Sequence, residues 1–382
     1  MNKVAIEICN DYDIENVRSS VRQAVDNLGG IKTFVSPGDR VLLKPNLLMR
    51  RKPEKATTTH PAVVQALAEL VVESGGKPII GDSPGEQQAF TESILDSIYD
   101  TCGMKEAASN GGAELNYNTD AVDMEYPYGE KVKSLKVIKV FTEVDKVINI
   151  PKLKTHMLTV CSGGVKNLFG IVPGKHKSDF HYRFKSINDF SDLLVDICLF
   201  AKPALTVMDA VVAMEGYGPT AGRPKKMGLI IAGKSPFNVD IVASNLIGLK
   251  ARHIPTIRKA AERALCSFEL KDIEITGEVI DNVKITDFKI PTFRLTQYYM
   301  SLPGFLMKWA DWITRPKIFF DYTCCISCRA CAKSCPASSI EMISGKPVFS
   351  QNKCIKCYCC LEICDKEAIH IKRPWYIRIF YK

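Results

Sequence analysis

Long hydrophobic runs are missing from this sequence of 382 residues. A transmembrane helix needs about 20 consecutive, mostly apolar residues, so no membrane span is predicted. The amino-terminal segment MNKVAIEICNDYDIE is charged and lacks the apolar core of a secretory signal. We therefore expect a cytoplasmic protein.

Signatures of nucleic-acid and nucleotide binding are also missing. The sequence has no helix-turn-helix, RRM or zinc-finger pattern, and its basic residues are spread along the chain, so nucleic acid is not an expected partner. No G-x-G-x-x-G follows a predicted strand, which argues against a dinucleotide site. The segment GIVPGKH at residues 170–176 is no P-loop, because its glycines are too close together and His176 replaces the serine or threonine that holds magnesium.

The overall composition is that of a globular protein, with 46% hydrophobic and 24% charged residues. The length allows two or three domains of roughly 100–200 residues each. Lysine and arginine number 51 against 42 aspartate and glutamate residues, which gives a formal net charge of +9. This moderate excess favours acidic partners or anionic ligands.

Strand-like and helix-like segments alternate through residues 1–290. Short apolar runs rich in branched residues predict strands, and longer segments with helical spacing predict helices. Such alternation predicts an α/β fold with a mostly parallel sheet covered by helices. The predicted strands span residues 4–8, 40–44, 78–81, 144–150, 205–208 and 228–231, and the predicted helices span residues 14–28, 61–74 and 238–249.

Aromatic residues crowd the next segment, residues 291–320, which we interpret as a connector. Its apolar residues follow helical spacing between Pro303, which can start a helix, and Pro316, which can stop one. We expect this helix to pack one domain on the other. The alternative is an interfacial membrane helix, assisted by the aromatic and basic tail at residues 374–382, so a membrane surface is a partner that we do not favour.

Cysteine is abundant, with 15 residues, of which ten lie between Cys324 and Cys364. In a cytosolic chain, such an excess indicates metal or redox chemistry before disulfides. The remaining cysteines are scattered, and we expect most of them to be small buried apolar residues. They are Cys9, Cys102, Cys161, Cys198 and Cys266.

Two cysteine runs have the C-x2-C-x2-C-x3-C spacing of bacterial ferredoxins, and they begin at Cys325 and Cys354. Paired C-x2-C elements also bind zinc, but the doubled spacing favours iron–sulfur clusters. In two-cluster ferredoxins, the fourth cysteine of each run serves the other cluster. We therefore predict two [4Fe–4S] clusters, one held by Cys325, Cys328, Cys331 and Cys364 and the other by Cys354, Cys357, Cys360 and Cys335.

Residues 321–373 resemble the two-[4Fe–4S] ferredoxin family, which implies a small α+β domain with pseudo-twofold symmetry. Cys324 and Cys359 are extra thiols beside predicted ligands, and Asp365 stands where that family usually has proline. Lysine and arginine outnumber the acidic residues in this segment. It therefore favours an acidic redox partner, such as a ferredoxin or a flavodoxin-like protein.

Polar residues follow several predicted strands of the larger domain. In open α/β sheets, ligands bind beyond the carboxyl ends of the strands. The lysines and the histidine in this set favour an anionic small molecule, a carboxylate or a phosphate. A plain turn at residues 81–85 and a helix entrance at residues 163–164 are the alternatives without a ligand. The candidate residues are Lys44, Asn46, Asp82, Ser83, Lys152, Lys154, His156, Lys166, Asn167 and Glu215.

The strings VLLKPNLL, THPAVV, GDSPG, PKLKTH, SGGVKNLFGIVPGKHK and AMEGYGPTAG resemble the DUF362 family, a domain of unknown function that often carries a ferredoxin module. They extend over about residues 35–250, and the resemblance implies no reaction. A shorter segment, with His156 ten residues before Lys166, is similar to the nickel-pincer lactate racemase family. In that family the matching lysine carries a pyridinium-derived cofactor. This second resemblance implies a shared fold more than shared chemistry.

The favoured interpretation is an electron-transfer protein or an oxidoreductase component, in which two clusters relay single electrons to an anionic substrate or cofactor. We expect Lys166, His156 and Lys154 to be catalytic, with His156 as acid–base and the lysines as charge clamps. One alternative is a non-catalytic ferredoxin-like carrier with a partner-docking head, and another is a relative of the racemases, so enzymatic activity stays open. A radical S-adenosylmethionine enzyme is disfavoured, because every cluster iron has its cysteine.

Overall fold

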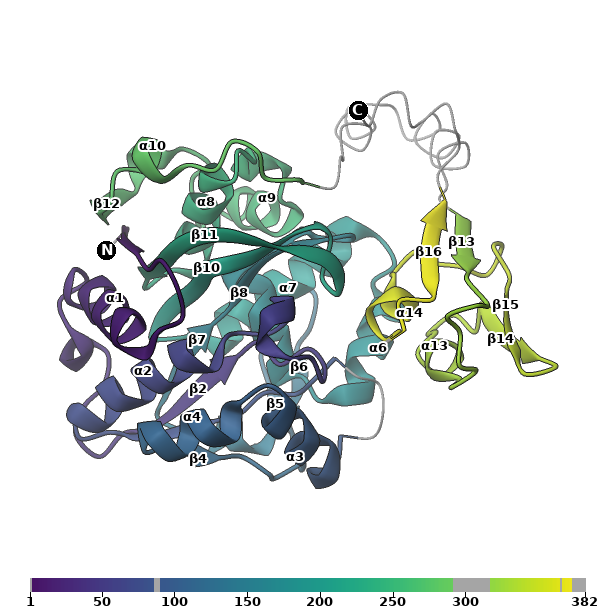
Figure 1. Ribbon diagram of the computed structural model, residues 1–382, viewed down its shortest axis with the longest axis horizontal. Helices are drawn as coiled ribbons and strands as arrows, with labels where there is room; N and C mark the ends of the chain where they lie inside the picture. The colour runs from purple at the N-terminus through teal and green to yellow at the C-terminus, as the bar shows by residue number, and fades with distance from the viewer. Residues whose placement is uncertain (1, 86–89, 291–316, 365, 373–382) are drawn as a thin grey trace.

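A mostly parallel β-sheet organises the larger part of the chain (Figure 1). The computed structural model describes residues 2–85, 90–290, 317–364 and 366–372. The strands of this sheet are β1 (Lys3–Ile8), β2 (Arg40–Pro45), β3 (Lys77–Ile80), β4 (Glu114–Leu115), β7 (Lys146–Ile150), β8 (Lys152–His156), β9 (Val160–Ser162), β10 (Leu205–Tyr217), β11 (Ala221–Gly233) and β12 (Glu274–Gly277).

The strand order is β12-β1-β11-β10-β7-β2-β3-β4, with β8 pairing both β10 and β9. Parallel pairs join β12 to β1, β8 to β10, and β10, β7, β2, β3 and β4 in succession. Antiparallel pairing is confined to both edges of β11 and to the β8–β9 pair. The predicted α/β class with a mostly parallel sheet is therefore confirmed.

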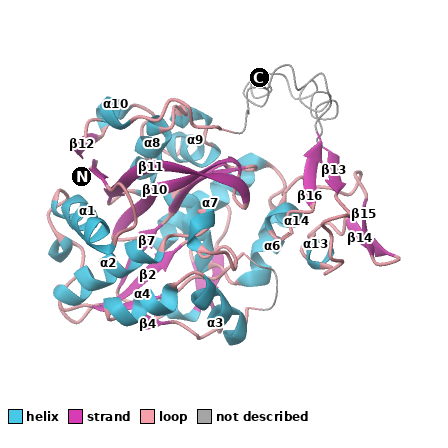
Figure 2. Ribbon diagram, viewed as in Figure 1, coloured by secondary structure: helices cyan, strands magenta, loops and turns pink. Residues whose placement is uncertain are grey.

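Helices cover both faces of this sheet (Figure 2). On one face lie α1 (Ile14–Asp26), α2 (Pro61–Glu73), α3 (Glu92–Thr101) and α4 (Met104–Gly111). On the other lie α5 (Gly164–Asn167), α7 (Ile187–Ala201), α8 (Pro236–Leu246) and α9 (Pro255–Glu262). Alternate residues of a strand point to opposite faces, so Val4 and Ile6 of β1 pack with the second group while Ala5 packs with the first.

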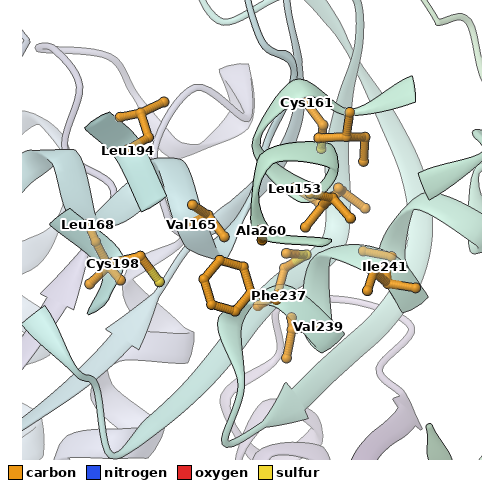
Figure 3. Packing of buried hydrophobic residues seen from close by; sticks show 14 of the residues in the cluster. Leu153, Cys161, Val165, Leu168, Leu194, Cys198, Phe237, Val239, Ile241 and Ala260 are labelled. Atoms are coloured by element: carbon orange, nitrogen blue, oxygen red, sulfur yellow. The ribbon is translucent and has the colours of Figure 1, made fainter. Parts of the chain in front are cut away.

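The hydrophobic core between the sheet and the second group of helices packs tightly around β8 and α5, which carry residues of the functional site. Figure 3 shows Leu153 of β8, Val165 of α5 and Phe237 of α8 gathered there. All three side chains are buried. This apolar packing fixes the positions of β8 and α5, because a buried side chain cannot shift without opening a cavity.

Further elements complete the larger part. They are the hairpin β5 (Ala121–Glu125) and β6 (Ser134–Ile138), the helices α6 (Gly174–Arg183) and α10 (Ile280–Val283), and 3₁₀ turns at Ile31–Thr33, Pro53–Lys55, Lys139–Thr142, Leu168–Ile171, Ala251–His253 and Leu270–Asp272. None of the helices in the described ranges is long and apolar enough to cross a membrane.

The smaller part consists of two short antiparallel strand pairs and two single-turn helices. Its elements are β13 (Lys317–Phe320), α13 (Ala330–Lys333), β14 (Ile340–Ile343), β15 (Lys346–Phe349), α14 (Cys359–Glu362) and β16 (Ile369–Lys372), with β13 antiparallel to β16 and β14 antiparallel to β15. Because β13 pairs with β16, residues 317–320 belong to this part and not to the predicted connector. The rest of that connector, residues 291–316, and the predicted tail at 374–382 lie outside the described residues.

The backbone of the smaller part repeats every 29 residues, as its cysteines do. Positive φ angles occur at Ser327, Arg329 and Ser338, and again at Lys356, Tyr358 and Glu367. The helices α13 and α14 are related by the same shift. Two halves with one backbone conformation are what the predicted pseudo-twofold symmetry requires.

Candidate functional site

A small pocket lies where the parallel strands β2 and β3 end, at the edge of the sheet where α/β proteins bind ligands. Its volume is about 70 Å³. Most of the residues that line it are polar, and they come from both parts of the chain. It is lined by Asn46, Leu48, Asp82, Ser83, Gly85, Lys154, His156, Ser162, Lys166, Asn167, Phe169, Gly170, Lys177, His181, Pro219, Cys359 and Glu362.

Strand β8 supplies two nitrogen-bearing side chains of the pocket, the amine of Lys154 and the imidazole of His156. Its alternating pattern sends Leu153 into the apolar core and leaves Lys154 and His156 on the opposite face. Lys154 Nζ donates to Asn46 Oδ1 at 2.8 Å and to the Thr57 carbonyl at 2.7 Å. Burial lowers the pKa of Lys154 to about 7, so this amine changes charge near neutral pH.

His156 is held as a hydrogen-bond donor toward the pocket. Its Nδ1 accepts from the backbone N–H groups of Leu158 at 3.0 Å and Thr159 at 3.4 Å. Burial, with Lys166 and Lys154 nearby, lowers the pKa of His156 well below its usual value, so the ring is neutral. In a neutral ring whose Nδ1 accepts, we infer from these hydrogen bonds that Nε2 carries the proton. This arrangement favours donation by Nε2 over the acid–base exchange predicted from the sequence.

The short helix α5 presents Lys166. The Asp240 carboxylate accepts from the backbone N–H groups of Gly164 and Val165 and so caps this helix. A Cβ at Gly163 would lie 2.1 Å from Asp240 Oδ1, so only glycine allows this approach. The Ser162-Gly163-Gly164 segment is therefore a helix entrance whose N–H groups already have an internal partner.

Lys166 is half-buried and differs from the buried lysines of the site. Its Nζ lies over the Phe169 ring, 5.4 Å from the centroid, and no hydrogen bond or ion pair is found for it among the described residues. Burial lowers its pKa, with a smaller opposing effect of Glu362. Lys166 is thus a lysine available to an incoming anion or electrophile.

Lys44 lies directly behind the pocket rather than in its wall. Its fully buried ammonium forms an ion pair with Asp82, 2.7 Å from Nζ to Oδ1. The second oxygen of Asp82 accepts from the Leu47 N–H at 2.9 Å. Lys44 therefore positions Asp82, which faces the pocket, instead of clamping a ligand. Breaking a buried pair of this kind by removing one partner costs about 3–5 kcal/mol.

Two further predicted ligand-binding residues, Lys152 and Glu215, also lie outside the pocket wall. Lys152 Nζ donates to Asp209 Oδ2 at 2.8 Å and to Tyr12 Oη at 2.7 Å. Glu215 accepts from the backbone N–H of Lys289 at 2.8 Å. Neither residue lines the pocket, because each is already engaged by a partner distant in sequence. Asn46, Asp82, Ser83, Asn167, Lys154, His156 and Lys166 are brought together.

Two residues of α6, Lys177 and His181, belong to the site although the sequence did not predict them. They lie four residues apart, so they occupy one face of that helix, and both line the pocket. Lys177 Nζ donates to Ser83 Oγ at 2.9 Å, and burial lowers its pKa to about 7. Their i, i+4 spacing is the one signal in the sequence that could have indicated them.

Glu362 and Cys359 were not predicted either, and they come from α14 of the smaller part. Glu362 Oε1 lies 3.3 Å from His156 Nε2. Cys359, one of the two extra thiols beside predicted ligands, is buried and lines the pocket. Near the same contact, Thr220 Oγ1 donates to the Leu361 carbonyl at 3.5 Å, and Arg51 approaches Glu367 at 3.8 Å. The smaller part thus closes the pocket of the larger part.

The predicted cluster ligands fall into two groups in space. One cavity is lined by Cys325, Cys328, Cys331 and Cys364, and a separate one by Cys335, Cys354, Cys357 and Cys360. The fourth cysteine of each run thus joins the other run. Backbone N–H groups of Ser339 and Ala368 donate to the sulfurs of Cys335 and Cys364 at 3.1 and 3.3 Å. Four cysteines with N–H donors to sulfur fit an iron–sulfur cluster.

Two segments of the chain match known protein families. The family described as "Domain of unknown function (DUF362)" matches residues 41–245, and the family described as "4Fe-4S dicluster domain" matches residues 317–365. The second match contains all eight predicted cysteine ligands and begins at β13. Both matches fall where the sequence motifs predict these two families.

Two individual proteins are similar to this chain. The thylakoid-associated protein sll1697 of Synechocystis sp. is 36% identical over 294 residues, which make up 73% of this chain and 86% of that protein. The lactate racemase apoprotein of Thermoanaerobacterium thermosaccharolyticum matches with a TM-score of 0.40 and 14% identity, over 63% of this chain and 57% of that one. At this TM-score the structural likeness supports no conclusion about chemistry.

Proposed function

Because this chain belongs to the DUF362 family and carries a 4Fe-4S dicluster domain, we propose that it delivers single electrons to an anionic ligand bound in the pocket of its larger part. One observation carries this proposal. The helix α14 lies between cluster cysteines in sequence, and its own Cys359 and Glu362 form a wall of the lysine-rich pocket. A cysteine cluster site and an anion site therefore share one boundary.

The eight cysteines would hold two [4Fe–4S] clusters in the two groups that line the two cavities. When bound, these clusters supply one-electron chemistry beside the pocket. The chain contributes the environment of the sulfurs. Its N–H donors at Ser339, Ala368 and Lys356 stabilise negative charge on cysteine sulfur, which is one of the factors that set a reduction potential.

The pocket residues would bind and orient the anion. Lys166 offers an ammonium without a fixed partner among the described residues, and Lys154 and Lys177 add positive charge when they are protonated. His156 offers its Nε2 proton as a hydrogen bond. Because all four side chains are buried or nearly so, water screens their attraction for an anion only weakly.

Electrons would enter at the other cysteine group, from an acidic redox protein such as a ferredoxin or flavodoxin. The cavity beside Cys325, Cys328, Cys331 and Cys364 measures about 1190 Å³. Exposed basic side chains on it include Arg329, Lys333 and Lys366, while Ile326 adds an apolar surface that is 61% exposed. Exposed basic and apolar residues side by side are typical of a transient protein interface.

The experiment uses full-length protein purified without oxygen and reduced with a stoichiometric amount of dithionite. A panel of small carboxylates and phosphates is then added, and reoxidation is followed by the visible absorbance and by EPR. The Lys166→Ala variant should keep its iron and its reducibility but lose ligand-dependent reoxidation by at least about 100-fold, as expected for a group that contacts the reacting ligand. The exposed Lys271→Ala variant is the control.

Each result bears on a named part of the proposal. Full reoxidation by Lys166→Ala would remove Lys166 from the site. Reoxidation that needs a second protein, and no member of the panel, would support the ferredoxin-like carrier with a docking head. The cytoplasmic location and the packing role of the predicted connector stay predictions, since the relative's name describes thylakoid association for that protein.

A further inference from the structure

A carboxylate of the smaller part already faces the nitrogens of the anion pocket. Glu362 Oε1 lies 3.3 Å from His156 Nε2, and the side chain of Glu362 is only 17% exposed. Neither atom meets the geometry of a hydrogen bond with any described residue. His156 is 1% exposed, so its unpartnered Nε2 has no access to bulk water. Two buried polar atoms at this distance without aligned partners indicate a site built for another occupant.

The lysines that influence Glu362 are the same ones that would attract an anionic ligand into the pocket. Burial lowers the pKa of both Lys154 and Lys166, and among the charged neighbours of each, Glu362 has the largest opposing effect. Asp82, the other carboxylate in the pocket wall, is engaged by Lys44 and by the Leu47 N–H. Among the described residues, Glu362 is therefore the carboxylate whose charge acts most strongly on both lysines.

The iron–sulfur fold itself does not require a carboxylate at this position. The repeat of 29 residues places Lys333 of α13 where α14 has Glu362, and both single-turn helices keep the same backbone. Lys333 is exposed, whereas Glu362 reaches into the larger part. Since one half of the repeat is built with a lysine here, the glutamate serves the pocket and not the cluster fold.

A tetrahedral phosphate fits this pocket less well than a planar carboxylate. Phosphate sites typically use backbone N–H groups at a helix start in addition to side chains. Here the N–H groups of Gly164 and Val165 already donate to Asp240. The space of about 70 Å³ also leaves room for only a few non-hydrogen atoms.

We propose that the Glu362 carboxylate occupies the place of the ligand's own carboxylate and leaves it when that ligand binds, so that the natural ligand is a small carboxylic acid anion. The proposal rests on the anion pocket of the proposed function and names its ligand class. Two carboxylates cannot both sit against His156 Nε2 without strong repulsion. Ligand entry therefore moves the side chain of Glu362, which lies on the same helix as Cys360.

The test measures binding of sodium acetate to the oxidised, cluster-loaded full-length protein by calorimetry, so it needs no turnover. Glu362→Gln keeps the size of the side chain and removes the competing charge. We expect it to bind acetate at least about tenfold more tightly than the wild type. Glu341→Gln makes the same charge change in the smaller part, at an exposed residue that pairs with Lys353, and should leave acetate affinity unchanged.

A second variant guards against a folding defect. Glu362→Ala opens space for the probe, so acetate should bind it at least as tightly as it binds Glu362→Gln. Iron content and the EPR spectrum of the reduced protein confirm that both variants retain their clusters. Inorganic phosphate at matched ionic strength should compete with acetate only weakly in both variants.

Four results would overturn the proposal. Equal acetate affinity in the wild type and in both Glu362 variants would leave the anion pocket in place but remove Glu362 as a stand-in. Weaker affinity in both variants would make Glu362 a fixed part of the ligand's cradle. Phosphate binding that is tighter than acetate binding would reject the ligand class. Binding of neither anion to any of these proteins would reject the pocket of the proposed function as well.

Discussion

At the scale of single residues, the amine of Lys154 decides how the pocket responds to pH. Its pKa is lowered to about 7 by burial, and a bound anion would raise it again. Below pH 7 the lysine is protonated with or without ligand, so affinity should be flat. Above pH 7 binding must take up a proton, so affinity should fall by up to about tenfold per pH unit. Lys177, whose pKa is also about 7, would steepen this fall.

Calorimetry in buffers with different ionisation enthalpies measures that proton uptake directly. Lys154→Met should weaken binding at pH 6 and reduce the uptake at pH 8. His156→Gln keeps an N–H donor and should leave the pH profile unchanged, since the neutral His156 ring does not titrate in this range. A break in the wild-type profile near pH 6 that disappears in His156→Gln would instead show that His156 takes up the proton.

The two neighbouring thiols Cys359 and Cys360 provide a second test at this scale. Cys360 lines a cavity with three other predicted ligands, whereas Cys359 lines the lysine pocket. We expect Cys360→Ser to lose about half of the iron and sulfide and Cys359→Ser to keep them. Iron and sulfide analysis of the two variants after anaerobic purification decides the matter. Iron loss in Cys359→Ser alone would exchange the two assignments.

At the scale of elements, the loop around Gly170 must pass close to the end of β3. A Cβ on residue 170 would lie 2.0 Å from Asp82 Oδ1 and 2.5 Å from Lys44 Nζ. Gly170→Ala should therefore push apart the Lys44–Asp82 pair and lower the free energy of unfolding by about 3–5 kcal/mol. Urea denaturation without oxygen measures this loss.

The matched control for that substitution is Gly248→Ala. Gly248 has a positive φ, at 73°, but no atom lies within 4 Å of the methyl group that the substitution adds, so only the left-handed backbone is penalised, by about 1–2 kcal/mol. Equal losses in the two variants would mean that the Lys44–Asp82 pair yields to the new methyl group without breaking.

The arrangement of helices and strands also explains how much of the site could be predicted from the sequence. The spacing of Cys325–Cys331 and its repeat is local, so both cysteine groups could be assigned from the sequence alone. Lys154 and His156 were predicted because they follow the apolar run at residues 144–150, although the strand β8 that carries them was not predicted. Lys152 was predicted on the same ground, but its partners Tyr12 and Asp209 are 140 and 57 residues away, and only the folded sheet brings them together. Glu362 reaches the pocket across the contact between the two parts, which no local pattern encodes.

At the scale of the whole molecule, the exposed residues Arg329, Lys333 and Lys366 beside Cys325–Cys331 form a basic rim. This rim should control the rate of reduction by an acidic protein. Replacing Arg329 and Lys366 by glutamate should slow reduction by a reduced flavodoxin at least about tenfold at low ionic strength, and added salt should narrow the difference. Stopped-flow absorbance measures both rates. Dithionite, which is small and needs no docking surface, should reduce the variant about as well as the wild type.

The control for this variant makes the same charge change elsewhere, with Lys271 and Lys284 replaced by glutamate on exposed positions of the larger part. Their replacement changes the net charge equally but leaves the rim intact. If both double variants slow flavodoxin equally, long-range attraction to the whole molecule, and not this surface, sets the rate.

The repeat of 29 residues also bears on the orientation in which the smaller part packs on the larger part. Its two halves have the same backbone, so a rotation by the pseudo-twofold axis would bring α13 to the place of α14. That reversed arrangement would press Lys333 against Lys154 and Lys166, where it would add a third cation in place of the Glu362 carboxylate, and these cations would repel one another strongly. The opposite charges of Glu362 and Lys333 thus allow the nearly symmetric smaller part to pack on the larger part in one orientation only. The same cysteine group therefore always faces the larger part.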